Sequence, residues 1–149
     1  ALSLGNIMSK RGDGLAQVMA QYQAAIAANP YRGDGYYATA ELLSRSGEFR
    51  GADQWYQQAV ERNPDSVSYA LSYAFNARDM GDPQLTLDRF RQIQKSFADQ
   101  HRVQAEAAWF YHGAGLVNEA QEAIDVAIRL AASNVPQTYL ERAKKIHGQ

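Results

Sequence analysis

The sequence contains no cysteine in its 149 residues. This absence excludes disulfide cross-links, thiolate metal sites and cysteine nucleophiles. No apolar run approaches the ~20 residues that a transmembrane helix requires, so we do not expect this segment to span a membrane. The net charge is only −1, and the basic residues are scattered among acidic ones. Neither nucleic acid nor an anionic membrane surface is therefore an expected partner.

Strand signals are also scarce, because period-two alternation is never sustained and clusters of β-branched residues are few. The common residues are instead Ala, Gln, Glu, Leu and Arg, which favour helices. Apolar residues recur at intervals of three and four, as on one face of a helix. The sequence therefore predicts an all-α protein with helices over residues 1–10, 15–28, 34–45, 49–62, 66–79, 83–97, 100–112, 117–131 and 136–147.

A period of 34 residues runs through these predicted helices. Gly47, Gly81 and Gly115 recur at the turn inside each helix pair, where glycine permits the positive φ that follows many helices. Small and bulky side chains fall in matching columns around these turns. The small column includes Ala40, Ala74 and Ala108, and the bulky column contains Tyr22, Tyr56, Phe90 and Ile124. Such columns let paired helices approach closely and interlock, so the period predicts a solenoid.

Residues 33–66 form the best-defined unit, and they resemble the tetratricopeptide repeat. The residues that carry the resemblance are Tyr36, Ala40, Leu43, Gly47, Phe49, Ala52, Tyr56, Ala59 and Pro64. It implies a right-handed superhelical α-solenoid of antiparallel helix pairs, forming a single domain over residues 1–149. About four units, over 1–32, 33–66, 67–100 and 101–134, would precede a capping helix at 135–147. The third unit departs from the pattern, with Pro83 where an aromatic residue is usual.

The two ends of the predicted array differ in polarity. The last helix carries Glu141, Arg142, Lys144 and Lys145, and we expect it to protect the end of the stack as a polar cap. The first ten residues carry the apolar side chains of Leu2, Leu4, Ile7 and Met8. This apolar face predicts further repeats or domains on the N-terminal side, and a homodimer contact is the alternative.

The resemblance also implies where a ligand binds, because the first helix of each pair lines the concave surface in this family. The 34-residue register then predicts a partner-binding groove for a protein or peptide. Its residues are Tyr37, Glu41, Arg45, Leu71, Phe75, Arg78, Trp109, His112 and Tyr139. Aromatic side chains edged by arginine suit an extended or helical segment. The alternative is that these aromatic residues pack against a neighbouring helix or against the C-terminal cap.

Other kinds of site are not expected. The family's clamp for a C-terminal carboxylate needs Lys and Asn at positions that here hold Tyr37, Glu41, Ser72 and Glu106. His101, His112 and His147 lack the spacing of metal ligands, and no residue pattern indicates a catalytic centre or a bound cofactor. Arg-Gly-Asp occurs at 11–13 and 32–34, where the repeat requires turns, so we do not interpret it as an adhesion motif.

These observations predict a soluble, non-catalytic interaction or scaffold module that binds a peptide or partner protein in its concave groove. The chain starts with Ala, lacks cysteine and is rich in Gln, Ala and Tyr. These features favour an envelope export or assembly complex, and the periplasm or cell envelope over the cytoplasm. The alternative is a small secretion-type chaperone of the same repeat family that acts as a dimer.

Overall fold

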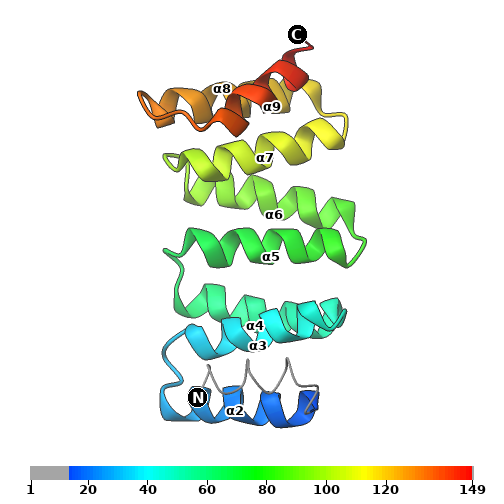
Figure 1. Ribbon diagram of the computed structural model, residues 1–149, viewed down its shortest axis with the longest axis vertical. Coiled ribbons are helices and arrows are strands. Elements are labelled where there is room, and N and C mark those ends of the chain that lie inside the picture. Colours follow the sequence, from blue (N-terminus) through cyan, green and yellow to red (C-terminus); the bar gives the residue numbers. More distant parts are fainter. Residues whose placement is uncertain (1–13, 149) are drawn as a thin grey trace. The chain divides into compact units, whose positions relative to one another are not determined.

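The computed structural model describes residues 14–148, with the side chain of Leu15 excepted. This part of the chain is helical and contains no strand (Figure 1). Its helices are α2 (Leu15–Ala28), α3 (Asp34–Arg45), α4 (Phe49–Arg62), α5 (Val67–Asp79), α6 (Pro83–Ser96), α7 (His101–Gly113), α8 (Val117–Ala131) and α9 (Gln137–His147). The all-α prediction is thus confirmed. The helix predicted over 1–10, and the apolar N-terminal face with it, lie outside the described residues.

Local signals account for the helix boundaries. Ser66, which the sequence places inside a helix, is instead the N-cap of α5, and its Oγ accepts a hydrogen bond from the Tyr69 amide at 3.2 Å. This bond satisfies one of the amides that lack a partner in the first helical turn. Gln100 likewise lies in extended conformation just before α7. Pro83 occupies the first position of α6, where its missing N–H costs nothing.

The predicted glycine turns are confirmed. Gly47, Gly81 and Gly115 have φ angles of +81°, +78° and +78°. In each turn the amide after the glycine reaches back to a carbonyl of the preceding helix, as the 2.8 Å bond from Glu48 N to Leu43 O shows. This is the bond pattern that closes a helix on a left-handed residue. The same glycine turn therefore ends the first helix of each pair at the same position in the repeat.

The part of the chain up to Pro83 forms one compact unit, in which α2, α3, α4 and α5 pack in sequence. Two buried clusters hold it together. The first is Val18, Tyr22 and Leu42, and the second is Ala40, Ala52 and Tyr56. Gly35 lets α3 approach α2, because a Cβ there would lie only 2.7 Å from Ile26 Cγ1. Small residues thus set the spacing between neighbouring helices.

The part from Gln84 onward forms a second compact unit. Within it α7 packs against α8, and α9 lies against both α8 and α7. Ala108 on α7 and Ala120 on α8 are fully buried, and the rings of Phe90 and Phe110 stack at 5.2 Å between α6 and α7. None of the described helices is both long and apolar enough to cross a membrane. The assignment of a single domain over 1–149 remains a prediction.

Candidate partner-binding surfaces

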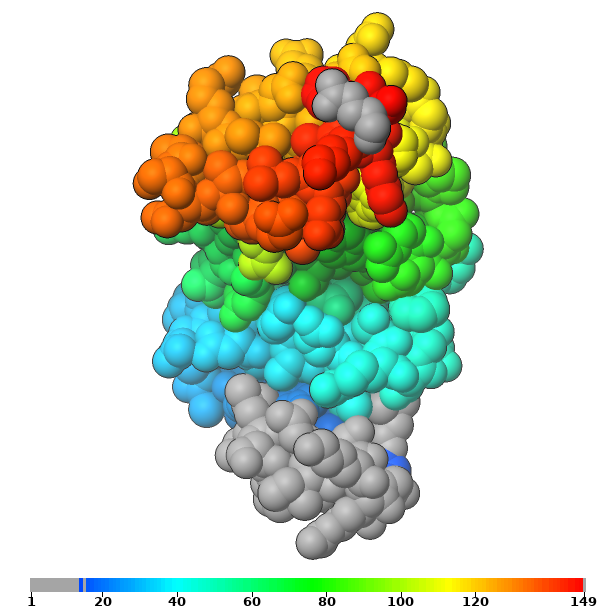
Figure 2. Space-filling view, turned by 45° about the horizontal axis from the view of Figure 1, so that its top comes forward, coloured from blue at the N-terminus to red at the C-terminus, as the bar shows by residue number. Residues whose placement is uncertain are grey.

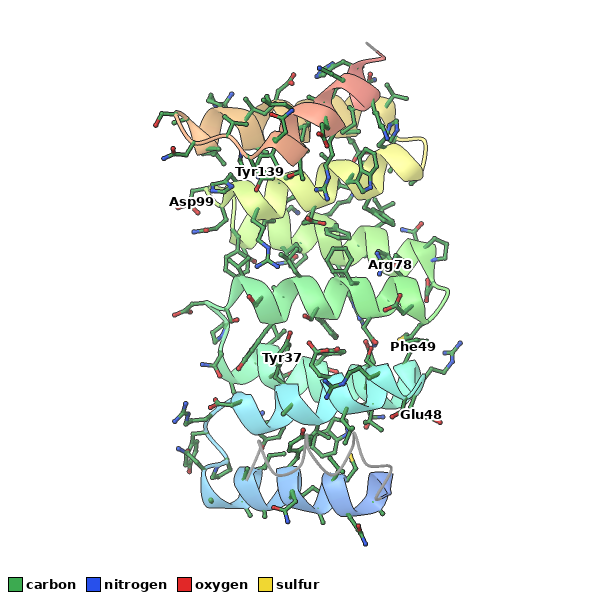
Figure 3. All side chains as sticks on the ribbon, in the orientation of Figure 1. Tyr37, Glu48, Phe49, Arg78, Asp99 and Tyr139 are labelled. Carbon is green, nitrogen blue, oxygen red and sulfur yellow. The ribbon has the colours of Figure 1, made fainter. Side chains whose placement is uncertain are left out.

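In the first unit, Tyr37 on α3 is held by the two helices that follow it (Figure 3). Its ring stacks on Tyr69 of α5 at 4.3 Å and meets the ring of Tyr56 of α4 edge-on at 5.9 Å. Its hydroxyl is hydrogen-bonded to Ser72 Oγ at 2.8 Å. The alternative stated from the sequence, packing against a neighbouring helix, therefore describes most of the Tyr37 side chain.

Glu41 lies one turn further along α3, inside the same hydroxyl cluster. It accepts a hydrogen bond from the Tyr56 hydroxyl at 3.2 Å. Burial raises the pKa of Tyr37 to about 12, and the nearby Glu41 carboxylate adds to this rise. Burial and Glu41 also raise the pKa of Tyr56. Both phenols are thus held in their neutral form, and their hydrogen bonds tie α3 to α4 and to α5.

Stability is expected to fall between about pH 10 and pH 12, because the folded state keeps these phenols neutral. The unfolded chain releases the Tyr37 proton near 10.0, whereas the folded chain holds it to about 12. Below pH 10 both states bind the proton and nothing is lost; above it, unfolding releases a proton and becomes more favourable. Because Tyr37 is partly exposed, we expect it to account for about 1 kcal/mol of the lost free energy of unfolding.

The measurement is urea unfolding at pH 9 and pH 11. Tyr37→Phe should show a smaller loss between the two pH values than the unchanged chain. Tyr31→Phe is the control, because Tyr31 is 86% exposed. An equal loss in the two variants would contradict the assignment of the alkaline sensitivity to the Tyr37 cluster.

The remaining predicted residues of the first unit differ in accessibility. Leu71 is only 1% exposed, so its side chain packs inside the protein and offers almost no surface to a ligand. Phe75 is half-buried, and the Arg78 guanidinium lies 4.9 Å above its ring. Arg78 also contacts Asp79 at 3.3 Å, and Arg45 is exposed in the last turn of α3. Phe75, Arg78 and Arg45 are therefore the accessible part of the predicted set.

In the second unit, Trp109 on α7 is a large apolar side chain with substantial exposure, at 37%. The ring of His112, also on α7, stacks beside it at 5.3 Å. Two cations of α9 lie over the indole: the Arg142 guanidinium is 5.5 Å and Lys145 Nζ is 5.9 Å from the ring centroid. An exposed indole edged by two cations of α9 and by an imidazole ring of α7 is suited to protein recognition.

Tyr139 on α9 is used differently. It is 7% exposed, and its hydroxyl is hydrogen-bonded to His101 Nδ1 at 2.8 Å. One turn on, Arg142 donates to Glu106 Oε1 at 3.2 Å, so α9 runs parallel to α7 along its length. Figure 2 shows α9, coloured orange-red to red, on the surface of this unit. Tyr139 thus fastens the capping helix to α7.

Sequence reasoning treated Arg142 and Lys145 only as polar residues of the cap. The structure places both beside Trp109. The 34-residue register places α9 through Tyr139, but it does not give the side chains that meet Trp109, because these contacts form only when the helices pack.

Sequence reasoning also missed a cleft in the second unit. It has a volume of about 410 Å³ and is lined by Arg91, Gln94, Lys95, Gln104, Tyr111, Glu119, Glu122, Ala123 and Val126. Its floor is a hydrogen-bond chain in which Tyr111 donates to Gln94, and Gln94 donates to Gln104 at 2.8 Å. One period earlier the matching residues are the apolar Ala77, Val60 and Ala70. This change from apolar to polar residues at matching positions of the repeat could have indicated the cleft from the sequence.

The histidines have partners within the second unit. His101 bonds Tyr139, His112 stacks on Trp109, and His147 Nε2 lies 2.8 Å from Asp125 Oδ1. Across residues 14–148, no group of three or more His, Asp or Glu side chains is arranged to hold a metal ion. In the second Arg-Gly-Asp motif, Arg32 pairs with Asp34 at 2.7 Å at the start of α3.

Comparison with known proteins supports the resemblance seen in the repeat. No protein-family model matches the chain. Over 105 residues, 70% of its length, the chain is 29% identical to the TPR repeat-containing protein YpiA of Bacillus subtilis (strain 168). It spans only about a quarter of that protein, because the match covers 24% of the relative.

Solved structures of tetratricopeptide repeat (TPR) proteins share the fold at low sequence identity. TTC0263, a thermophilic TPR protein of Thermus thermophilus, matches with a TM-score of 0.70 and 17% identity, over 99% of this chain and 80% of that one. YrrB, described as a TPR protein with an unusual peptide-binding site, matches at 0.62 and 13%, over 99% and 85%. MamA (41-end) of Desulfovibrio magneticus RS-1 matches at 0.64 and 12%, over 98% and 90%. The fold predicted from the repeat, a TPR-like α-solenoid, is confirmed.

Proposed function

We propose that this chain, whose fold and repeats are those of tetratricopeptide repeat proteins, is a non-catalytic module that binds a peptide or a partner protein. Each of the two compact units offers a binding surface on the first helices of its pairs. The observation that carries the proposal is Trp109, which remains 37% exposed between His112 and the cations of α9. Indole and guanidinium groups are the side chains that most often dominate the energy of protein interfaces.

The surroundings of Trp109 support this role. The His112 ring stacks beside the indole, and two cations of α9 lie over it; α9 is itself fixed by the Arg142–Glu106 pair at 3.2 Å. A side chain that is already ordered loses little entropy when a partner covers it. The indole is therefore a preorganised anchor for an apolar or aromatic residue of the partner.

The first unit offers a second contact region. Phe75 has its ring covered on one side by Arg78, and Arg45 and the half-buried Glu41 lie on α3. The side chains of Leu71 and Tyr139 are buried. We therefore assign them a structural role beneath the surface and not a contact with the partner. Tyr37 keeps a partial role, since its ring is stacked on one side.

The proposal is tested with Trp109→Ala and Phe75→Ala in the isolated chain. A partner is first recovered by cross-linking and pull-down, and its affinity is then measured by calorimetry. We expect each change to weaken binding by at least about 2 kcal/mol, the usual effect of truncating an interface anchor. Circular dichroism and melting should change little for Trp109→Ala, because its side chain is already partly in water.

Val117→Ala is the matched control. Val117 is also an exposed apolar residue, at 54%, but it starts the second helix of its pair. It should leave the affinity unchanged. Full affinity in both Trp109→Ala and Phe75→Ala would refute the assigned surface.

At a finer level, we propose that the module belongs to an envelope export or assembly complex in the periplasm or cell envelope, with further repeats or domains on its N-terminal side. The support is compositional: the chain lacks cysteine and is rich in Gln, Ala and Tyr. A signal peptide or a membrane-embedded domain in the full reading frame would support this assignment. The alternative, a dimeric secretion-type chaperone, predicts a dimer in sedimentation, and a monomer at high concentration would argue against it.

A further inference from the structure

The capping helix brings positive charge to the exposed indole of the second unit. Arg142 and Lys145 of α9 lie 5.5 Å and 5.9 Å from the centroid of the Trp109 ring. The helix α9, which carries Tyr139 in the 34-residue register, therefore supplies the two cations beside Trp109.

Several charged groups around this site are already paired with one another. Arg142 is paired with Glu106, and both side chains are about one quarter exposed, at 23% and 26%. His147 is paired with Asp125 at 2.8 Å. Among the described residues no ion pair engages Lys145. The Glu106 and Asp125 carboxylates are thus already occupied, and the ammonium group of Lys145 contacts the indole without a carboxylate from the described part of the chain.

A cation over an aromatic face still has bonding capacity. The interaction of Lys145 with the ring is weak at an exposed site, and the ammonium group keeps three N–H donors. A carboxylate bound there would form a charge-assisted hydrogen bond, which is stronger than a neutral one. The adjacent indole would at the same time cover an apolar side chain of the same ligand.

We propose that the surface formed by Trp109, His112, Arg142 and Lys145, here called the α7–α9 surface, binds an acidic segment of a partner chain. In that segment a Glu or Asp side chain lies next to an apolar residue. The carboxylate meets Lys145 and the apolar residue covers Trp109. Recognition uses side-chain carboxylates and needs no free C-terminus. This inference rests on the proposed function and names the chemistry of its partner.

The test uses Trp109 as its own reporter. The chain has two tryptophans, and Trp55→Phe leaves Trp109 as the only indole. Two short peptides with blocked ends are titrated into this variant: one contains Glu, Ala and a single Leu, and in the other every Glu is Gln. We expect the Glu peptide to change the Trp109 fluorescence with saturation, and the Gln peptide to bind at least about five-fold more weakly.

Ionic strength and charge variants then locate the contact. Raising the salt from about 0.1 M to about 1 M shortens the screening length from about 10 Å to about 3 Å. The affinity of the chain for the Glu peptide should therefore fall. Lys145→Gln should lower the affinity for the Glu peptide about five-fold, and Lys145→Glu should lower it more than about ten-fold. Lys95→Gln is the matched control, because it removes one exposed lysine of the same unit from α6, where it lines the separate cleft. Arg142 is left unchanged, since it fastens α9.

The outcomes separate this inference from the proposed function. Equal binding of the Glu and Gln peptides, or a Lys145→Glu variant that binds as well as Lys95→Gln, would overturn the acidic-segment assignment. The proposed function would survive that result if Trp109→Ala still abolished partner capture. It would fail only if both Trp109→Ala and Phe75→Ala kept the partner.

Discussion

Replacing Asn76 by Asp is expected to destabilise the first unit by about 3–5 kcal/mol at neutral pH, the usual cost of an unpaired buried charge. Asn76 lies on α5 and is 2% exposed. Its Nδ2 donates to the Phe49 carbonyl at 2.9 Å and to Asp53 Oδ1 at 3.0 Å. The side chain therefore connects α5 to the first turns of α4. Asp has the same shape, so the effect isolates charge and hydrogen bonding from packing.

The local chemistry makes this substitution severe. The new carboxylate would face one carbonyl oxygen and one carboxylate oxygen at hydrogen-bond distance, with no donor between them. Asn76 Oδ1, the other end of the group, has no hydrogen-bond partner among the described residues. No donor is thus in place to compensate the added charge. Desolvation and repulsion act in the same direction.

Acidification should relieve the defect. Burial and the Asp53 carboxylate both raise the pKa of the introduced group in the folded state. The deficit is therefore complete above that raised pKa and shrinks as pH falls through it, because the protonated acid can again donate a hydrogen bond. Urea unfolding at pH 7 and at pH 4.5 should show the variant approaching the unchanged chain at the lower pH.

Asn118→Asp provides the control. Asn118 is exposed in the first turn of α8, where a negative charge is mildly favourable to the helix. It should be neutral or slightly stabilising at pH 7. If Asn76→Asp were as stable as Asn118→Asp, the hydrogen bonds that connect α5 to α4 would not carry the stability assigned to them.

Most of the fold could be predicted because its signals are local. Asn29-Pro30 ends one helix, Pro83 begins another, and Gly47 closes the helix before it. The limits predicted for α2, α3, α4 and α8 coincide with those observed. The other limits of the described helices differ by one residue, as at Ser66, where a serine that caps a helix is easily counted as part of it.

The candidate site was predictable in position but not in exposure. The register places Tyr37, Leu71 and Trp109 on first helices, yet only Trp109 keeps a large exposed fraction. Exposure depends on what the adjacent helix supplies. Ser72 and Tyr69 cover Tyr37, whereas α9 places cations over the Trp109 ring and still leaves that side chain 37% exposed. The sequence of one repeat unit does not determine which side chains of the next unit will contact it.

Asn76 shows the same limit. Its counterparts one period away are Leu42 and Phe110, so the sequence presents a polar residue in an apolar column. That contrast indicates a special environment. It does not reveal that the partners are a carbonyl and a carboxylate on the preceding helix, because those partners become adjacent only once the helices pack.

Gly33→Ala is expected to destabilise the first unit by about 2 kcal/mol, a typical cost of overpacking. Gly33 precedes α3 with an ordinary φ of −79°, so the requirement for glycine is not conformational. A Cβ there would lie 2.3 Å from Asn63 Oδ1 and 3.0 Å from both the Ala59 carbonyl oxygen and Tyr69 Cε2. Asn63 would have to move, and it would lose the 2.7 Å bond that it accepts from the Gly33 amide.

Gly51→Ala is the matched control for Gly33→Ala. Gly51 lies within α4 of the same unit, and an added Cβ would meet only Leu43 Cδ1 at an ordinary 3.9 Å. It should stabilise by up to about 1 kcal/mol, because alanine favours the helix. Opposite signs for the two variants in urea unfolding are the expected result, and a stabilising Gly33→Ala would contradict it. The repeat alone gives no warning of this difference, since Val67 and His101 occupy the matching positions. The close approach of Asn63 and Tyr69 therefore makes Gly33 a steric requirement of this one unit.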